Sequence, residues 1–121
     1  MTKANPVQEK SFRFALDVVR LYGSLRERHE YELGRQLLCS GTAIGANVEE
    51  ALASVSRPDF IAKMSIASKE ARECHYWLRL LTDASIVETA PLLGSCTELV
   101  RLLTSIVMTA QRGPRSTALD S

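Results

Sequence analysis

The chain has 121 residues, of which 45% are hydrophobic, 24% are charged and 6% are aromatic, with 6 glycines and 4 prolines. This length is typical of one globular domain that buries a core without metals or disulfides. Because 15 Lys and Arg residues face 14 Asp and Glu residues, the formal net charge of +1 gives no electrostatic reason to expect a polyanionic partner.

The longest segment without charged residues runs from Gln36 to Val48 and contains Ser, Thr, Asn and Gly, so it is too polar and too short to span a bilayer. The first ten residues have no apolar signal core. The 3 cysteines, an odd number, are typical of reduced thiols in a cytosolic protein. We therefore expect a cytoplasmic protein with no membrane contact.

The first predicted helix covers residues 6–28. Asn5 has the side chain of a helix N-cap, and Pro6 occupies the first helical position, where its missing N–H has no cost. Apolar residues at three- and four-residue spacing predict an inner stripe of Phe12, Ala15, Leu16, Val19 and Tyr22.

The second and third predicted helices cover residues 31–55 and 57–83. Between them, Ser56 can cap, Pro58 can open the helix, and Asp59 can complete a capping box. The predicted core face of the second helix is Leu33, Leu37, Ile44, Val48, Leu52 and Val55; that of the third is Phe60, Met64, Ala67, Ala71, Cys74, Leu78 and Leu81.

The fourth predicted helix covers residues 89–112, and residues 113–121 are expected to be a frayed tail. Its predicted core face is Leu92, Cys96, Leu99, Leu103, Ile106 and Ala110. Short connections between long helices make neighbouring helices antiparallel. The sequence thus predicts an all-α protein, one up-down-up-down four-helix bundle.

The second predicted helix is uncharged on the face opposite its core stripe. That face contains Cys39, Thr42, Ala43 and Ala46, all small. A helix that has no charges on either side for over three turns is normally buried on both sides, and a lone four-helix bundle buries only one of them. We therefore predict that this face contacts a second protein surface.

Gly41 and Gly45 lie four residues apart in the same helix, where each costs about 1 kcal/mol relative to Ala. Such spacing allows a neighbouring helix to approach closely. A kink near Gly41 is the alternative interpretation. A phosphate-binding loop would need a Lys-Ser or Lys-Thr pair after Gly45, and the sequence has neither there.

Trp77 belongs to a second stripe on the third predicted helix, with Ile66, Glu70, Glu73 and Leu80. Three roles stay open for it: packing between helices, anchoring a partner, or stacking on a base. We group Trp77 with the predicted oligomer interface.

The polar residues predict structure rather than catalysis. The paired Glu-x-x-His motifs of di-iron bundles are absent, and the cysteines form no C-x-x-C pair, so we expect neither an enzyme nor a metal or other cofactor, and no small-molecule substrate is evident. A structural polar network is expected from Asn47, Glu50, Glu70, Arg72 and Glu73.

Four arginines of the first predicted helix could form a basic surface on assembly. Arg13, Arg20, Arg26 and Arg28 lie on one predicted helix, and a symmetric assembly would multiply their charge. They are the candidate contacts for a nucleic-acid partner.

Two motif blocks carry a family resemblance. The first is Ser40-Gly41-Thr42-Ala43-Ile44-Gly45-Ala46-Asn47-Val48-Glu49-Glu50-Ala51, and the second runs from Asp59-Phe60 through Lys69-Glu70-Ala71-Arg72-Glu73 to Tyr76-Trp77-Leu78. From about residue 12 to 107 the chain resembles the four-helix-bundle proteins of intervening sequences in bacterial 23S rRNA genes, the S23 family.

The resemblance implies a small cytosolic bacterial bundle whose relatives form ring-like pentamers, with no catalytic residues to carry over. A related branch, the accessory variability determinants of retroelements, is strongly basic and works with RNA, unlike this nearly neutral chain. The sequence thus predicts a non-enzymatic homo-oligomer, with a pentamer favoured, that serves as an interaction scaffold; the alternative is an RNA-binding accessory factor.

Overall fold

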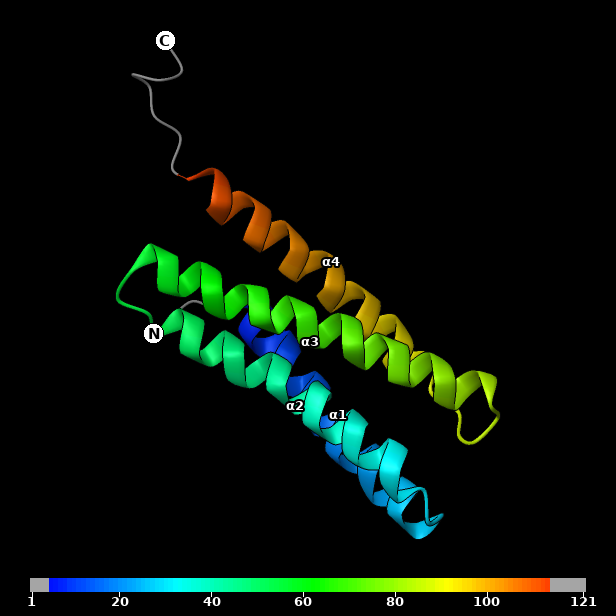
Figure 1. Ribbon diagram of the computed structural model, residues 1–121. Coiled ribbons are helices and arrows are strands. Elements are labelled where there is room, and N and C mark those ends of the chain that lie inside the picture. The colour runs from blue at the N-terminus through cyan, green and yellow to red at the C-terminus, as the bar shows by residue number, and fades with distance from the viewer. Residues whose placement is uncertain (1–4, 114–121) are drawn as a thin grey trace, which may run out of the picture.

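The computed structural model describes residues 5–113, and four α-helices account for most of this part of the chain (Figure 1). They are α1 (Pro6–Glu27), α2 (Tyr31–Leu52), α3 (Arg57–Asp83) and α4 (Ala90–Arg112). Residues 5–113 contain no strand, so the all-α class is confirmed. Apart from Gly113, the predicted frayed tail lies outside the described residues.

Side-chain caps fix the starts of α1 and α3. The Asn5 Oδ1 atom accepts the Gln8 N–H at 3.1 Å, and the Ser56 Oγ atom accepts the Asp59 N–H at 3.2 Å. Each helix also has a proline in its first turn. Both N-terminal boundaries therefore follow from local sequence chemistry.

The second helix ends at Leu52, three residues before the predicted end at Val55. Ser56 must take an extended backbone, φ −138° and ψ 154°, to cap α3, so the chain has to leave the helix before it. The Ser54 hydroxyl donates to the Glu50 carbonyl at 3.1 Å and satisfies an acceptor at the helix end. As a result Val55 is fully exposed instead of belonging to the core.

The helices form a closed ring of neighbours in which α1 packs on α2, α2 on α3, α3 on α4, and α4 on α1. The contact between α4 and α1 is much the smallest of the four. In Figure 1, α4, α3 and α2 follow one another downwards, and α1 lies behind α2. This arrangement confirms the four-helix bundle.

The buried core confirms most of the predicted stripe of α3. Met64, Ala67, Ala71, Cys74, Leu78 and Leu81 are all buried, and Phe60 is half-buried. In α2, Leu37, Ile44 and Val48 are buried, whereas Leu33 is half-buried and Leu52 is exposed.

The predicted inner stripe of α1 is wrong. Phe12, Leu16 and Val19 are 62%, 42% and 50% exposed, and Ala15 and Tyr22 are only half-buried. The face that enters the core instead consists of Val7, Ser11, Phe14, Val18 and Leu25. α1 is apolar on two nearly opposite faces, and periodicity alone did not say which one faces the core.

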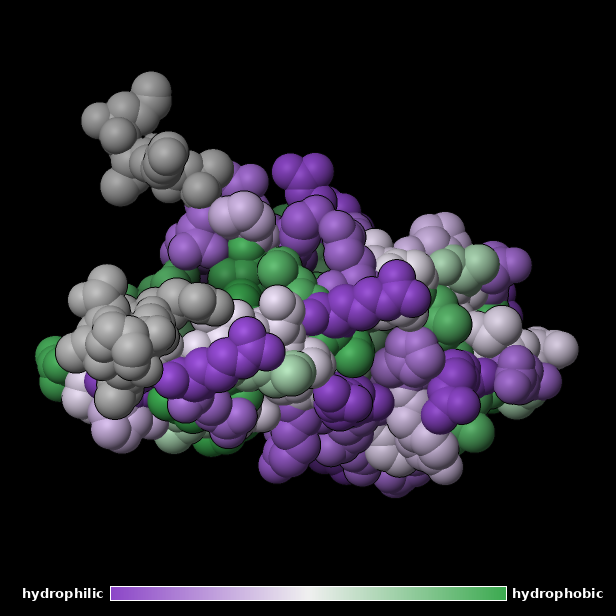
Figure 2. Space-filling model, turned by 90° about the horizontal axis from the view of Figure 1, so that it is seen from above, coloured by the Kyte–Doolittle hydropathy of each residue, from purple (hydrophilic) through white to green (hydrophobic). Residues whose placement is uncertain are grey.

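The last helix, α4, buries Cys96, Leu99 and Leu103, and leaves Leu92, Ile106 and Ala110 half-buried. By length and composition alone, α4 is long and apolar enough to cross a membrane, but core helices of globular proteins pass the same test. Of its most apolar window, 17% is buried in this chain. Seen from above, hydrophobic residues gather in patches between hydrophilic side chains (Figure 2). The bundle thus leaves considerable apolar surface uncovered.

Candidate functional site

The first candidate surface is the apolar stripe of Phe12, Leu16 and Val19, which we call the α1 stripe. A shallow groove beside it is lined by Phe12 and Leu16 together with Glu9, Arg13, Asp17 and Arg20. The Arg20 guanidinium pairs with the Asp17 carboxylate at 3.4 Å. Sequence analysis missed this surface because it assigned the stripe to the core; the signal was a second apolar face on the same helix.

The second candidate surface is the predicted small face of Cys39, Thr42, Ala43 and Ala46, which we call the α2 face. Cys39 and Ala46 are exposed, while Thr42 and Ala43 are half-buried. The Thr42 hydroxyl donates to the Leu38 carbonyl of its own helix at 2.7 Å, so it is satisfied without a partner. The α2 face therefore offers shape and apolar area rather than polar groups.

Gly41 and Gly45 lie within a continuous helix, facing α1. A Cβ atom at Gly41 would come within 2.8 Å of both γ-methyl carbons of Val18, whereas one at Gly45 would lie 3.4 Å from the Ser11 carbonyl oxygen. These glycines bring the α1 and α2 backbones together, and they select the Ser11–Val18 face of α1 for the core.

Trp77 is half-buried on α3 and packs against the core. Its indole N–H donates to the Glu73 carboxylate at 3.4 Å, and its ring meets that of Tyr76 edge-on at 5.2 Å. Ile66 and Leu80, on the same stripe, are 39% and 37% exposed. The residue has a packing role and still presents an edge to the surface.

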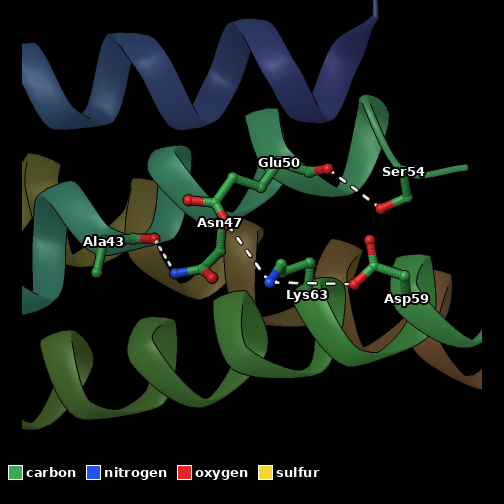
Figure 3. Close-up of polar contacts among 6 residues, drawn as sticks. All are labelled: Ala43, Asn47, Glu50, Ser54, Asp59 and Lys63. Atoms are coloured by element: carbon green, nitrogen blue, oxygen red, sulfur yellow. Dashed lines mark hydrogen bonds and ion pairs between the residues drawn. The ribbon is translucent and has the colours of Figure 1, made fainter.

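The polar residues of α2 make separate contacts. The Asn47 side-chain amide donates to the Ala43 carbonyl at 2.8 Å, within its own helix (Figure 3). The Glu50 carboxylate lies 3.5 Å from the Lys63 ammonium of α3, which also lies 4.0 Å from Asp59. Of Asn47 and Glu50, only Glu50 therefore makes a polar contact with α3.

The other members of the predicted polar network lie elsewhere on α3. Glu70 is 4.0 Å from the adjacent Lys69, Glu73 accepts from Trp77, and Arg72 donates to the Thr104 hydroxyl of α4 at 2.9 Å. The structure thus does not bring Asn47, Glu50, Glu70, Arg72 and Glu73 into one connected network.

Three of the four predicted nucleic-acid contacts have a partner within the chain. Arg28 donates to the Ile86 carbonyl at 2.6 Å, Arg20 pairs with Asp17, and the Arg26 guanidinium lies 6.0 Å from the Tyr22 ring centre. Arg13 borders the α1 stripe.

The cysteines differ in access. Cys39 is exposed, while Cys74 and Cys96 are fully buried, and the Cys96 thiol donates to the Ala71 carbonyl at 3.3 Å. Hydrogen bonding with the Cys74 thiol, together with burial, raises the pKa of Cys96 well above its ordinary value. A thiol held protonated in this way is a packing group and not a nucleophile.

Within residues 5–113 no cluster of three or more His, Cys, Asp or Glu side chains is arranged to hold a metal ion. The polar chemistry of the described residues consists of caps, single ion pairs and hydrogen bonds. The candidate function therefore lies in surfaces.

Comparison with known proteins gives a clear relationship. A family model described as 23S rRNA-intervening sequence protein matches residues 3–105. The chain belongs to this family. A crystal structure from Bacteroides thetaiotaomicron VPI-5482, of an S23 ribosomal protein family member with unknown function, is 43% identical and superposes with a TM-score of 0.80, covering 84% of this chain and 97% of that chain.

The comparison with curated proteins gives no match. Membership of the 23S rRNA-intervening sequence protein family confirms the predicted resemblance and the bundle fold. Neither the family description nor the Bacteroides relative indicates an enzyme class.

Proposed function

We propose that this 23S rRNA-intervening sequence protein is a cytoplasmic homo-oligomeric scaffold without catalytic activity of its own. The observation that carries the proposal is the α1 stripe, where three large apolar side chains are at least 42% exposed on one face of a helix. Fully burying such a side chain is worth about 1.5–3 kcal/mol, so covering the stripe would favour association.

A second copy is the occupant that fits the stripe. The α2 face is uncharged and made of small side chains, so the bulky stripe of a neighbouring copy can approach it closely. The side chains that border the stripe are two acids and two arginines, so the stripe carries no net charge that would oppose contact with an uncharged face. The two surfaces are therefore complementary in size.

Contact between two different faces makes a head-to-tail interface, which closes into a ring when the rotation between copies permits. A ring agrees with the pentamer that the family resemblance implies. We assign Trp77 to the same contact, because this half-buried aromatic residue still presents an edge to the surface.

The proposal is tested by the mass of the purified protein in solution. We expect a discrete oligomer by light scattering at micromolar concentration. Leu16→Glu places a charge in the stripe and should give monomers with unchanged helicity. Ala46→Leu should weaken assembly from the other side, because a larger side chain blocks close approach to the α2 face.

The matched control is Ala62→Glu, which adds the same charge at an exposed alanine of α3 outside both surfaces. This variant should keep the oligomer. A wild-type monomer would contradict the proposal, as would a Leu16→Glu variant that remains as large as the control.

The absence of catalysis is supported by how the polar groups are used. Burial and hydrogen bonding raise the pKa of the Cys96 thiol, and on α3 the Glu70 carboxylate faces Lys69 while that of Glu73 accepts from Trp77. RNA binding by the pooled arginines of α1 is the competing proposal, and a steep loss of RNA affinity with salt would favour it.

A further inference from the structure

A groove of about 390 Å³ runs along the seam between α3 and α4. It is lined by Arg72 and His75 of α3 and by Thr97, Val100 and Arg101 of α4. Its volume is in the range of sites that hold small ligands. Neither the α1 stripe nor the α2 face contributes a residue to it, so this site does not depend on assembly.

The cations of this groove are not neutralised by the protein. Among the described residues, none of Arg72, His75 and Arg101 takes part in an ion pair. In a chain with 14 acidic residues for 15 basic ones, two arginines without an ion-pair partner, beside one histidine around the same hollow, form a distinct feature.

Carboxylates that are close in sequence are engaged elsewhere. Glu73 follows Arg72, but its carboxylate accepts from the indole N–H of Trp77, one turn along α3. Glu98 follows Thr97, but it pairs with Lys10 of α1 at 2.7 Å. Neither Glu73 nor Glu98 thus lines the groove, and the two arginines leave positive charge in it.

One guanidinium is already held in place. The Arg72 Nη2 atom donates to the Thr104 hydroxyl of α4 at 2.9 Å. A guanidinium has five N–H donors in a planar fork, so donors remain for a ligand while its orientation is fixed. Val100 supplies an apolar wall beside it.

We infer that this groove binds a phosphate group. Arginine forks match phosphate oxygens with two parallel hydrogen bonds, and two guanidinium groups together balance the two negative charges of a phosphate group. His75 adds a further polar side chain beside them. A second hollow shares Val100 and Arg101 and continues along α4 to Arg112. The site is thus long enough for adjacent phosphates.

The same chemistry has two sources, a small phosphate ester or polyphosphate and the backbone of an RNA strand. Two probes separate them: inorganic pyrophosphate, and a short oligouridylate that is unstructured. Binding of each is measured by titration calorimetry, with competition of one against the other to show whether they share a site.

The decisive variant is Arg72→Gln with Arg101→Gln. Hydrogen bonds to charged groups are strong enough that each lost arginine should weaken pyrophosphate binding about tenfold. The control is Arg35→Gln with Lys69→Gln, which removes the same charge from exposed positions of α2 and α3 that do not line the groove. It should leave pyrophosphate affinity within about twofold. Equal melting temperatures would show that both variants fold.

Each outcome decides the inference. Pyrophosphate binding that only the groove variant loses supports a small phosphoanion. Oligouridylate binding that only the groove variant loses supports an RNA backbone at the same site. The inference is overturned if the wild-type protein binds neither probe, or if the control variant loses as much affinity as the groove variant.

Discussion

At the scale of single residues, the surroundings of Gly41 and Gly45 predict different effects of an alanine substitution on stability. At Gly41 an added methyl group meets both γ-carbons of the buried, β-branched Val18 at 2.8 Å, and that side chain has little freedom to turn. At Gly45 the nearest atom is at an ordinary contact distance of 3.4 Å. Alanine also raises helix propensity by about 1 kcal/mol at either site.

We therefore expect Gly41→Ala to be less stable than Gly45→Ala by about 1–3 kcal/mol, measured as the free energy of unfolding in denaturant. Gly45→Leu should destabilise strongly, because its larger side chain cannot avoid the Ser11 backbone. Equal stabilities of the two alanine variants would show that α1 is farther from Gly41 than described.

The thiols predict a chemical asymmetry. Under native conditions a thiol reagent should modify Cys39 and spare Cys74 and Cys96, because both are fully buried. The raised pKa of Cys96 means that the folded state keeps a proton that the unfolded chain releases above about pH 8.5.

The folded state is thus stabilised fully below that pH and loses this contribution as the pH rises further. The melting temperature of the wild-type protein should fall more steeply between neutral and alkaline pH than that of Cys96→Ala. Parallel pH profiles of the two melting temperatures, or fast modification of all three thiols, would contradict the burial of Cys74 and Cys96.

At the scale of the helices, the sequence predicted α3 well and α1 poorly for a physical reason. The core stripe of α3 is bordered by charged residues such as Lys63 and Arg72, so only one face can be buried. In α1 two apolar faces compete, and the choice depends on glycines that belong to α2. Information that lies on the partner helix is not contained in the periodicity of the helix itself.

The groove between α3 and α4 shows the same limit. Arg72 and Arg101 are far apart in sequence, and each has an acid within three residues, so local charge counts conceal them. Only the packing of the two helices shows that the acids turn away. The place of the α2 face on its helix, by contrast, could be read from the spacing of four small uncharged residues, and its role as an interface stays a prediction.

At the scale of the whole molecule, the bundle is stabilised by apolar packing and local caps. No metal-ligand cluster exists in the part of the chain that the structure describes, so excess chelator should leave helicity and melting temperature unchanged. Circular dichroism with and without chelator checks this expectation. A fall of several degrees on chelation would reveal a bound ion that contributes to folding.

The small contact between α1 and α4 also has a consequence for how the bundle opens. The α2–α3 pair has the most extensive contact of any two helices, whereas α4 has α3 as its only extensive neighbour. Partial unfolding should therefore start by detaching α4, and its amide hydrogens should exchange with solvent before those of α2 and α3. Because Arg72 is aligned by Thr104 of α4, a ligand held between α3 and α4 would slow that exchange by attaching α4 more firmly to its main neighbour.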